Sequence, residues 1–395
     1  MSISSTLFTL VLLAGLPVEV TRLDGSRQSG ELVGLSATAL RIDGTAGPVE
    51  IPVTELQEVQ LPAADDPAAP LVVELTDETL LAGEGITIEG GQLKLSSQQL
   101  GELSLSTDRV RSVLLAKLSD VQIPLWNEMR QKVSQSDLLI VRKGENLDFV
   151  GGTIGAVSEG AVTLISRGRE VKVPREKIVG LVYATHKVVV GSPVCEVATR
   201  NGSRLRIKGG ELLEGKAQLT LHGTPPIQMQ IPLEALRSFD FGLGRIVPLM
   251  KSMTQQKLPA GVSETTVAVR NHAYSSSSLQ KIPLLLGGKP YSDGLLLHPQ
   301  TKLEFTLNRQ YRKLRCVVGI DENASERARF EPVVQVQILA DGKSIWGQPV
   351  RWDAAPIALD LDLTDVKTLE IITSTADGKI GPLRHVDFAD AKLIK

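Results

Sequence analysis

The sequence predicts an all-β protein: tandem small five-stranded, barrel-like repeats followed by a β-sandwich of the jelly-roll type. Three observations lead to this fold class. A set of about five short runs that alternate apolar and polar residues recurs four times in the first two thirds of the chain. The last third contains at least seven more strand-like runs. The 395 residues include 35 glycines and 21 prolines, which supply the many turns that short strands need.

The N-terminus carries a mostly apolar run from Leu7 to Leu16. Its length is typical of the hydrophobic region of a signal peptide and too short for a stable membrane anchor. The alternative is a first buried strand. We expect residues 1–17 to be a signal peptide, no transmembrane anchor elsewhere, and a secreted, periplasmic or cell-envelope location.

Four similar segments follow, at Val18–Leu61, Val72–Leu115, Leu138–Tyr183 and Val194–Phe241. We therefore expect two repeats in residues 18–117 and two in residues 138–245. Units of this size bury little surface alone, so neighbouring repeats should pack in pairs. They resemble Sm-like or SH3-like barrels in outline only, and no function follows from that likeness.

Local signals place the turns inside each repeat. Asp24-Gly25 and Asn201-Gly202 predict type I′ hairpins between the first two strands. Pro52, Pro174 and Pro232 should end the fourth strand, because proline has no N–H to donate to a ladder. A short helical turn is then expected before the fifth strand; the second repeat lacks the proline.

Two connectors are predicted. Residues 118–137 should form a short amphipathic helix that starts near Pro124. Trp126 on it serves either as an anchor between pairs of repeats or as a ligand platform, and the anchor is the favoured interpretation. Residues 246–261 are expected to be a linker into the last domain, residues 262–395.

The last domain carries an ordered set of motifs. They are Tyr291–Pro299, Leu303–Leu307, Tyr311–Asp321, Val334–Lys343, Leu359–Leu363, Leu369–Ile371 and His385–Leu393. This set resembles the NPCBM family of carbohydrate-binding modules, which have a galactose-binding-like jelly-roll fold. The closing motif departs from the family pattern at Phe388, where a Trp is usual, and at Arg384, where an Asp is usual. The resemblance implies a glycan ligand.

Candidate sugar contacts are Tyr291, His298, Trp346 and Trp352. Each also has a structural interpretation: His298 as a hydrogen-bonding residue before a strand, and the two tryptophans as core or edge packing. Phe388 is expected in the core because it alternates with Val386; a sugar platform is the alternative.

Candidate metal ligands are Asp321, Asp387 and Asp390, whose carboxylates could hold a structural calcium ion. The alternative is that they shape their loops through bonds to the backbone. Cys195 and Cys316 lie in separate apolar runs, which favours two buried thiols over a disulfide between domains.

Composition narrows the function. The net charge of −2 comes from 43 basic and 45 acidic residues without a basic stripe, which argues against nucleic acid as a partner. No catalytic motif occurs in the sequence. We therefore expect an exported, non-catalytic protein that binds carbohydrate through its last domain. The alternative is a structural or assembly protein that contacts other proteins, such as those of the cell envelope.

Overall fold

The computed structural model describes residues 16–62, 68–132, 134–184, 193–213, 215–223, 225–257, 269–270, 273–274, 281–323, 332–378 and 384–395. The predicted signal peptide lies outside these residues, apart from its last two. The chain forms two compact units, Met1–Leu243 and Gly244–Lys395. Nearly all regular structure is antiparallel β, as predicted, and the one α-helix of the described residues has ten residues, too few to cross a membrane.

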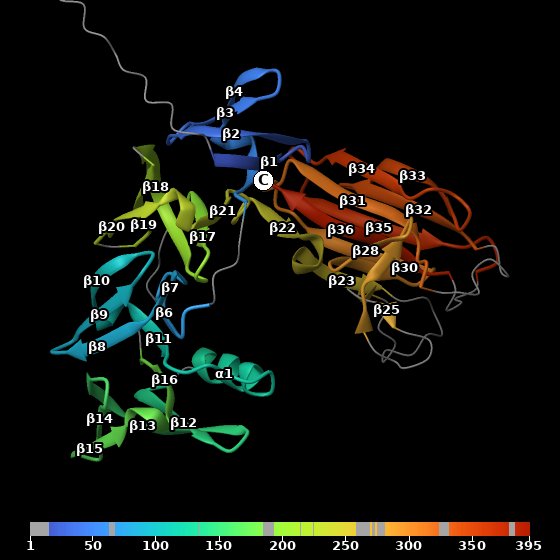
Figure 1. Cartoon of the computed structure of the whole chain (residues 1–395). Helices are drawn as coiled ribbons and strands as arrows, with labels where there is room; N and C mark the ends of the chain where they lie inside the picture. The colour runs from blue at the N-terminus through green and yellow to red at the C-terminus, as the bar shows by residue number, and fades with distance from the viewer. Residues whose placement is uncertain are drawn as a thin grey trace, which may run out of the picture. The chain divides into compact units, whose positions relative to one another are not determined.

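Each of the four predicted segments folds into five strands that follow one plan (Figure 1). Repeat 1 has β1 (Leu16–Arg22), β2 (Arg27–Leu35), β3 (Ala39–Gly44), β4 (Gly47–Pro52) and β5 (Leu56–Gln60). Repeat 2 has β6 (Leu71–Leu75), β7 (Leu80–Gly83) continued by β8 (Gly85–Glu89), β9 (Gln92–Ser97), β10 (Gly101–Ser106) and β11 (Val110–Leu114). Repeat 3 has β12 (Asp137–Lys143), β13 (Asn146–Val157), β14 (Ala161–Ser166), β15 (Arg169–Pro174) and β16 (Ile178–Val182). Repeat 4 has β17 (Cys195–Thr199), β18 (Arg204–Leu213), β19 (Lys216–Leu221), β20 (Gln228–Pro232) and β21 (Leu236–Asp240).

The pairing within a repeat curls the sheet around its own apolar side chains. In repeat 1 the order is β4-β3-β2-β1-β5, because the fifth strand returns to pair with the first. Among the described residues no ladder joins the fourth strand to the fifth, so each sheet stays open. Alternate residues such as Val20, Leu40 and Ile51 point into the core.

The three prolines act as predicted. Pro52, Pro174 and Pro232 each end a fourth strand and lead into a 3-10 helix: η1 (Val53–Glu55), η3 (Arg175–Lys177) and η4 (Leu233–Ala235). Repeat 2 has no proline here. Its η2 (Thr107–Arg109) is capped instead by the Ser106 side chain, which accepts from the Asp108 N–H.

The predicted type I′ hairpins are wrong. Such turns need positive φ at both central residues, but only the glycines have it, Gly25 at 78° and Gly202 at 97°. In repeat 1 the Gly25 N–H donates to the Arg22 carbonyl (2.8 Å) and the Arg22 N–H to the Ser26 carbonyl (2.9 Å), which defines a type I turn followed by a bulged glycine. Asp24 keeps negative φ because its carboxylate accepts from the Ser26 N–H two residues on (2.8 Å).

Ladders also join the repeats, in an order that the sequence did not predict. The fifth strands pair between repeats, β5 with β21 and β11 with β16. Repeat 1 therefore pairs with repeat 4 and repeat 2 with repeat 3, so only the second pair joins sequence neighbours. Repeats 2 and 4 meet through β7 and β18. The resulting order is 1-4-2-3, with repeats 1 and 3 at its ends.

The contact between repeats 2 and 4 has an internal twofold relationship. Leu80 pairs with Arg204, and these two residues occupy the same position in their repeats. The Ala82 N–H donates to Ser203 Oγ (3.0 Å), and the Arg206 N–H donates to Thr79 Oγ1 (3.3 Å). Each bond is the counterpart of the other, so the two repeats use one surface reciprocally.

Helix α1 (Gln122–Gln131) occupies the predicted connector. Trp126 is buried against Leu138, Ile140 and Val179 of repeat 3. Its ring lies over Gly180, where a Cβ would come within 2.5 Å of it. Trp126 is therefore an anchor that fixes the helix beside the β11–β16 seam, and not an exposed ligand platform.

The second unit is a sandwich of two antiparallel sheets around one core, as predicted. The first sheet contains β24 (Val269–Arg270), β29 (Gly294–Leu297), β36 (Val386–Ile394), β31 (Lys313–Ile320) and β34 (Ile357–Asp362), with β22 (Ile246–Pro248) on β36. The second contains β23 (Met253–Lys257), β30 (Thr301–Thr306), β35 (Thr368–Ser374), β32 (Val333–Ala340) and β33 (Lys343–Arg351). Two short hairpins are added, β25 (Ala273–Tyr274) with β26 (Lys281–Ile282) and β27 (Leu284–Leu286) with β28 (Lys289–Tyr291).

The predicted linker at residues 246–261 is not a simple linker. It begins with β22, the 3-10 helix η5 (Leu249–Ser252) and β23, which add a strand to each sheet. Pro248 precedes the helix as Pro52 precedes η1. Leu249 is fully buried in the sandwich core, so the domain needs these residues and starts well before residue 262.

Candidate functional site

The candidate site lies at one end of the first sheet of the sandwich, where three neighbouring strands begin or end. His298 follows β29, His385 precedes β36, and Asp321 follows β31. Asp387 is the second residue of β36 and faces Leu296 on one side and Gly319 on the other. Antiparallel pairing thus gathers residues from three distant stretches of sequence.

Strand alternation puts all four side chains on one face. Val386, Phe388, Leu297 and Ile320 point into the sandwich core. Their neighbours His298, His385, Asp321 and Asp387 therefore point to the opposite, outer face of the sheet. The same face carries a small apolar cluster formed by Leu284, Leu286, Leu296, Ala273 and Ala389, which covers part of it.

The two histidines form a direct pair. His385 Nε2 and His298 Nδ1 are 3.0 Å apart, and the rings meet edge to face with centroids 4.3 Å apart. One nitrogen must donate and the other accept, so the bond requires that at least one ring be neutral. Both residues are half-buried, and the His298 Nε2 atom is itself buried.

Asp321 and Asp387 are two buried acidic residues near the histidines: Asp387 lies two residues after His385, and Asp321 follows the neighbouring strand β31. Asp387 is completely buried and Asp321 nearly so. No N–H or hydroxyl of the described residues donates to the Asp387 oxygens. Burial and the neighbouring Asp321 carboxylate raise the pKa of Asp387 well above its usual range. Burial also raises the pKa of Asp321, although Asn323 donates to it through its backbone N–H (3.2 Å) and side chain (2.9 Å).

More polar groups stand at this end of the sandwich. Arg384 forms two hydrogen bonds to Asp377, of 2.7 and 2.9 Å. The Gln300 amide donates to Thr375 Oγ1 (3.0 Å). Together with the imidazoles, these groups form an array of planar donors and acceptors that sequence analysis missed, because the residues are scattered over the motif set and carry no spacing signal.

The predicted sugar contacts do not form one cluster. Tyr291 is half-buried at the end of β28, beside the outer apolar cluster. Trp346 lies on β33, the edge strand of the opposite sheet, and Trp352 follows that strand; both pack partly against the sandwich core. Of the four, only His298 belongs to the site described here.

The predicted calcium ligands are divided too. Asp390 is exposed and accepts from Lys392 Nζ (3.0 Å), whereas Asp321 and Asp387 are buried. No group of three His, Cys, Asp or Glu side chains among the described residues is placed to hold a metal ion.

Comparison with known proteins bears on this unit. Residues 252–394 match the NPCBM/NEW2 domain model. The matched segment begins in η5 and ends in β36, so it includes both sheets of the sandwich and the four site residues. No curated protein matches the chain.

Three solved structures with some similarity contain CBM51 modules. A CBM51 from a Clostridium perfringens GH95, in complex with methyl-galactose, is 19% identical with a TM-score of 0.30, covering 38% of this chain and 99% of that one. A C. perfringens ZmpB structure with CBM51-2 bound to GlcNAc is 18% identical with a TM-score of 0.31, covering 49% and 42%. Tandem CBM51 modules of a Streptococcus pneumoniae family 98 glycoside hydrolase are 10% identical with a TM-score of 0.33, covering 68% and 90%.

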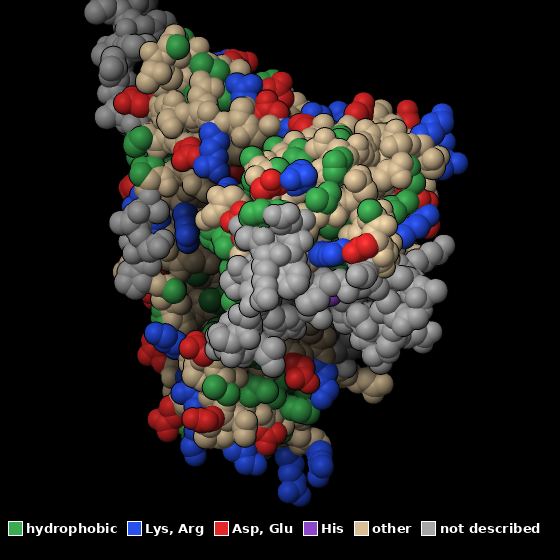
Figure 2. All heavy atoms as spheres, turned by 90° about the vertical axis from the view of Figure 1, so that its right-hand side faces the viewer, with side chains coloured by type: hydrophobic (Ala, Val, Ile, Leu, Met, Phe, Trp, Pro, Cys, Tyr) green, Lys and Arg blue, Asp and Glu red, His purple; other side chains and the backbone are tan. Residues whose placement is uncertain are grey.

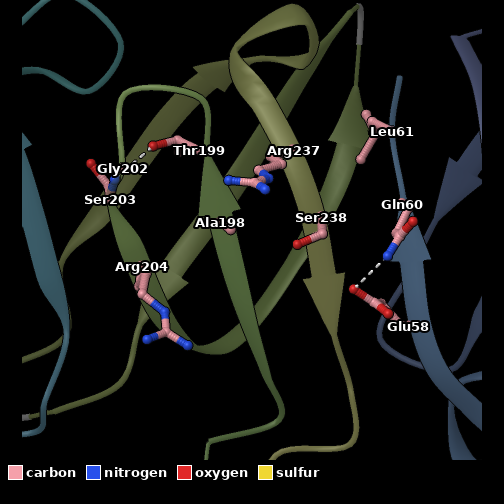
Figure 3. Close-up of a pocket in the computed structure, with 10 residues that line it drawn as sticks. All are labelled: Glu58, Gln60, Leu61, Ala198, Thr199, Gly202, Ser203, Arg204, Arg237 and Ser238. Carbon is pink, nitrogen blue, oxygen red and sulfur yellow. Dashed lines mark hydrogen bonds between the residues drawn. The ribbon is translucent and has the colours of Figure 1, made fainter. Parts of the chain in front are cut away.

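The first unit has a hollow at the seam of repeats 1 and 4 (Figure 3). Its volume is about 540 Å³ and its lining is mostly polar. These polar groups bond to protein neighbours: Gln60 donates to Glu58 (3.1 Å), and Arg204 donates to Glu196 (2.8 Å). Thr199 and Ser203 both bond to Asn201. We therefore regard this hollow as a structural groove.

Proposed function

We propose that this protein is an exported, non-catalytic carbohydrate-binding protein, and that its glycan binds at the His298–His385 end of the sandwich. The match of residues 252–394 to the NPCBM/NEW2 domain carries the proposal. Sugar hydroxyls bind to planar polar side chains that donate and accept hydrogen bonds, and this end of the sheet collects such groups.

A binding role fits the chemistry of the acid pair better than catalysis does. A glycosidase needs two carboxyl groups that reach the bond to be cleaved from opposite sides. Asp321 and Asp387 are both buried, so their carboxyl groups are not exposed to a glycosidic oxygen.

The charge distribution is consistent with a neutral ligand. In Figure 2, acidic and basic side chains are interspersed over the visible face. At the proposed site the Arg384 and Asp377 charges are paired with each other. The hydroxyls of a neutral sugar could form hydrogen bonds at this site while the Arg384–Asp377 ion pair stays intact, so no charge would be left unpaired.

A glycan array probed with the full chain tests the proposal. We expect selective binding that His385→Ala abolishes and His298→Ala weakens severely, because each removes a ring of the pair. The matched controls are Trp346→Ala and Trp352→Ala on the opposite sheet, which should bind normally. Equal, weak signals across diverse glycans would contradict carbohydrate binding, and loss of binding only in the tryptophan variants would place the site elsewhere.

Export is tested separately. Mass spectrometry of the protein from its native cells should find an N-terminus near Pro17 or Val18, at the start of β1. A chain that retains Met1 in the cytoplasm would refute this part of the proposal and leave glycan binding open.

A further inference from the structure

Repeat 3 exposes apolar side chains at positions that are buried in repeats 2 and 4. Val150 on β13 is 43% exposed, and its counterparts Leu81 and Leu205 are 0% exposed. Val171 on β15 is 48% exposed, and its counterparts Leu103 and Met229 are 8% and 7% exposed. The opening between β13 and β15 of repeat 3, where Val150 and Val171 lie, is thus exposed.

This opening is an apolar groove of about 850 Å³. Leu139 and Leu164 form its floor and are almost completely buried, and Val141 and Val173 lie beside them. Phe149, 41% exposed, stands at the rim with Lys132 Nζ 4.5 Å from its ring centroid. An apolar groove on an end repeat is unusual, since the end repeats of an array normally present polar residues outward.

Repeat 1, the other end repeat, has polar residues at two of these positions. Its residue at the Val150 position is Gln28, and its residue at the Phe149 position is Arg27. Of the two end repeats, repeat 3 is therefore the more apolar at these two positions of its second strand.

The contact between repeats 2 and 4 shows what kind of partner fits. There, Leu80 and Arg204 pair across the internal twofold, and the adjacent Leu81 and Leu205 are buried. Phe149 is the residue of repeat 3 at the Leu80 and Arg204 position. A second copy of repeat 3 therefore offers the same reciprocal surface, with Phe149 facing its own counterpart.

The strand that carries Phe149 has a free edge. Among the described residues, β13 pairs with β12 from Asn146 to Gly152, and its other side meets β14 only from Thr153 onward. The Phe149 backbone N–H donates to the side-chain carboxylate of the preceding residue, Asp148 (2.9 Å). The lining of the groove also includes the exposed or half-buried residues Arg167 and Arg169.

We propose that two copies of this chain associate through repeat 3, with the Asn146–Gly152 stretch of β13 paired to the same stretch of the second copy, covering Val150 and Val171. The inference is independent of glycan binding. Such a dimer carries two sandwich domains, one from each copy, and is therefore bivalent for any ligand of the sandwich.

Sedimentation velocity on the full chain over a wide concentration range tests the association. We expect a reversible dimer that Val150→Glu combined with Val171→Glu converts to monomer. The control is Val33→Glu, an exposed valine of β2 in repeat 1, which should leave the dimer intact. A wild-type monomer at every concentration, a dimer that survives the double change, or an open-ended polymer would overturn the proposal. Thermal melts of the variants confirm that each is folded.

Cross-linking tests the twofold register. Directly paired residues of antiparallel strands have Cα atoms about 4.5–5.5 Å apart, within the range of a disulfide. Phe149→Cys should therefore form a disulfide-linked dimer on mild oxidation, and Val33→Cys should not. The native Cys195 and Cys316 are buried free thiols and will not compete. Equal cross-linking of the two variants would contradict this arrangement.

Discussion

Thr79 and Ser203 hold equivalent positions in repeats 2 and 4, and each accepts a backbone N–H from the other repeat. Both side chains are completely buried. The hydroxyls thus replace, at the contact, the strand-to-strand bonds that a regular ladder would provide.

Removing either hydroxyl should destabilise the first unit. Ser203→Ala leaves the buried Ala82 N–H without an acceptor, at a cost of about 1–3 kcal/mol in the free energy of unfolding. Thr79→Val should act in the same way on Arg206, with less effect because that bond is longer. Urea unfolding measures both. The control is Ser26→Ala at the exposed equivalent turn of repeat 1, and a Ser203→Ala effect no larger than this control would refute the role of the contact.

Gly180 should be intolerant of any side chain. A Cβ there would lie 2.5 Å from the Trp126 ring and 2.7 Å from the Val113 carbonyl oxygen, so Gly180→Ala forces the helix or the β11–β16 seam to move. We expect a loss of about 1–3 kcal/mol, typical of overpacking. Gly34→Ala is the matched strand control, because nothing lies within 4 Å of its Cβ position. Melting temperatures that agree between the two variants would show that Trp126 does not anchor the helix.

The acid pair predicts a pH-dependent stability of the sandwich. Because the folded-state pKa of Asp387 is raised, its contribution is fully present below the usual Asp pKa of about 3.9 and is lost as the pH rises toward the folded-state value. Asp387→Asn keeps a donor toward Asp321 at every pH. The variant should match the wild type near pH 4 and become progressively more stable than the wild type as the pH rises to 8.

Thermal unfolding of the full chain at several pH values gives this comparison. Asp390→Asn is the control, since Asp390 is an exposed residue of the same strand, and its difference from the wild type should not follow the Asp387→Asn trend. A constant gap between Asp387→Asn and the wild type across the pH range would show that folding does not raise the pKa of Asp387.

Phe388 is completely buried in the sandwich core, where the sequence pattern placed it. Phe388→Ala should cost about 3–5 kcal/mol, because the cavity cannot fully collapse between two sheets. Denaturant midpoints measure the loss, with Ile345→Ala on β33 as an exposed control. A loss below about 1 kcal/mol for Phe388→Ala would be at odds with the core position.

The sequence determined the local structure of this protein with few errors. Alternation of apolar and polar residues is a property of the strand itself, so it predicted the four repeats, the sandwich and the buried Phe388. Proline acts on its own residue and the next, so Pro52, Pro174 and Pro232 marked the ends of their strands. The turn type at Asp24 failed because it depends on a side-chain bond to Ser26 that competes with positive φ.

Only the tertiary structure decided which distant segments meet. Strand pairing between repeats depends on which exposed edges fit together, and nothing local in β5 indicates β21 as its partner. The site depends on the same kind of information: His298 and His385 are far apart in the chain, and the register of β29 on β36 alone brings their rings together. The sequence could name His298 as a candidate, but its partner His385 and the raised pKa of Asp387 follow from burial and from neighbours in space, which a linear pattern does not contain.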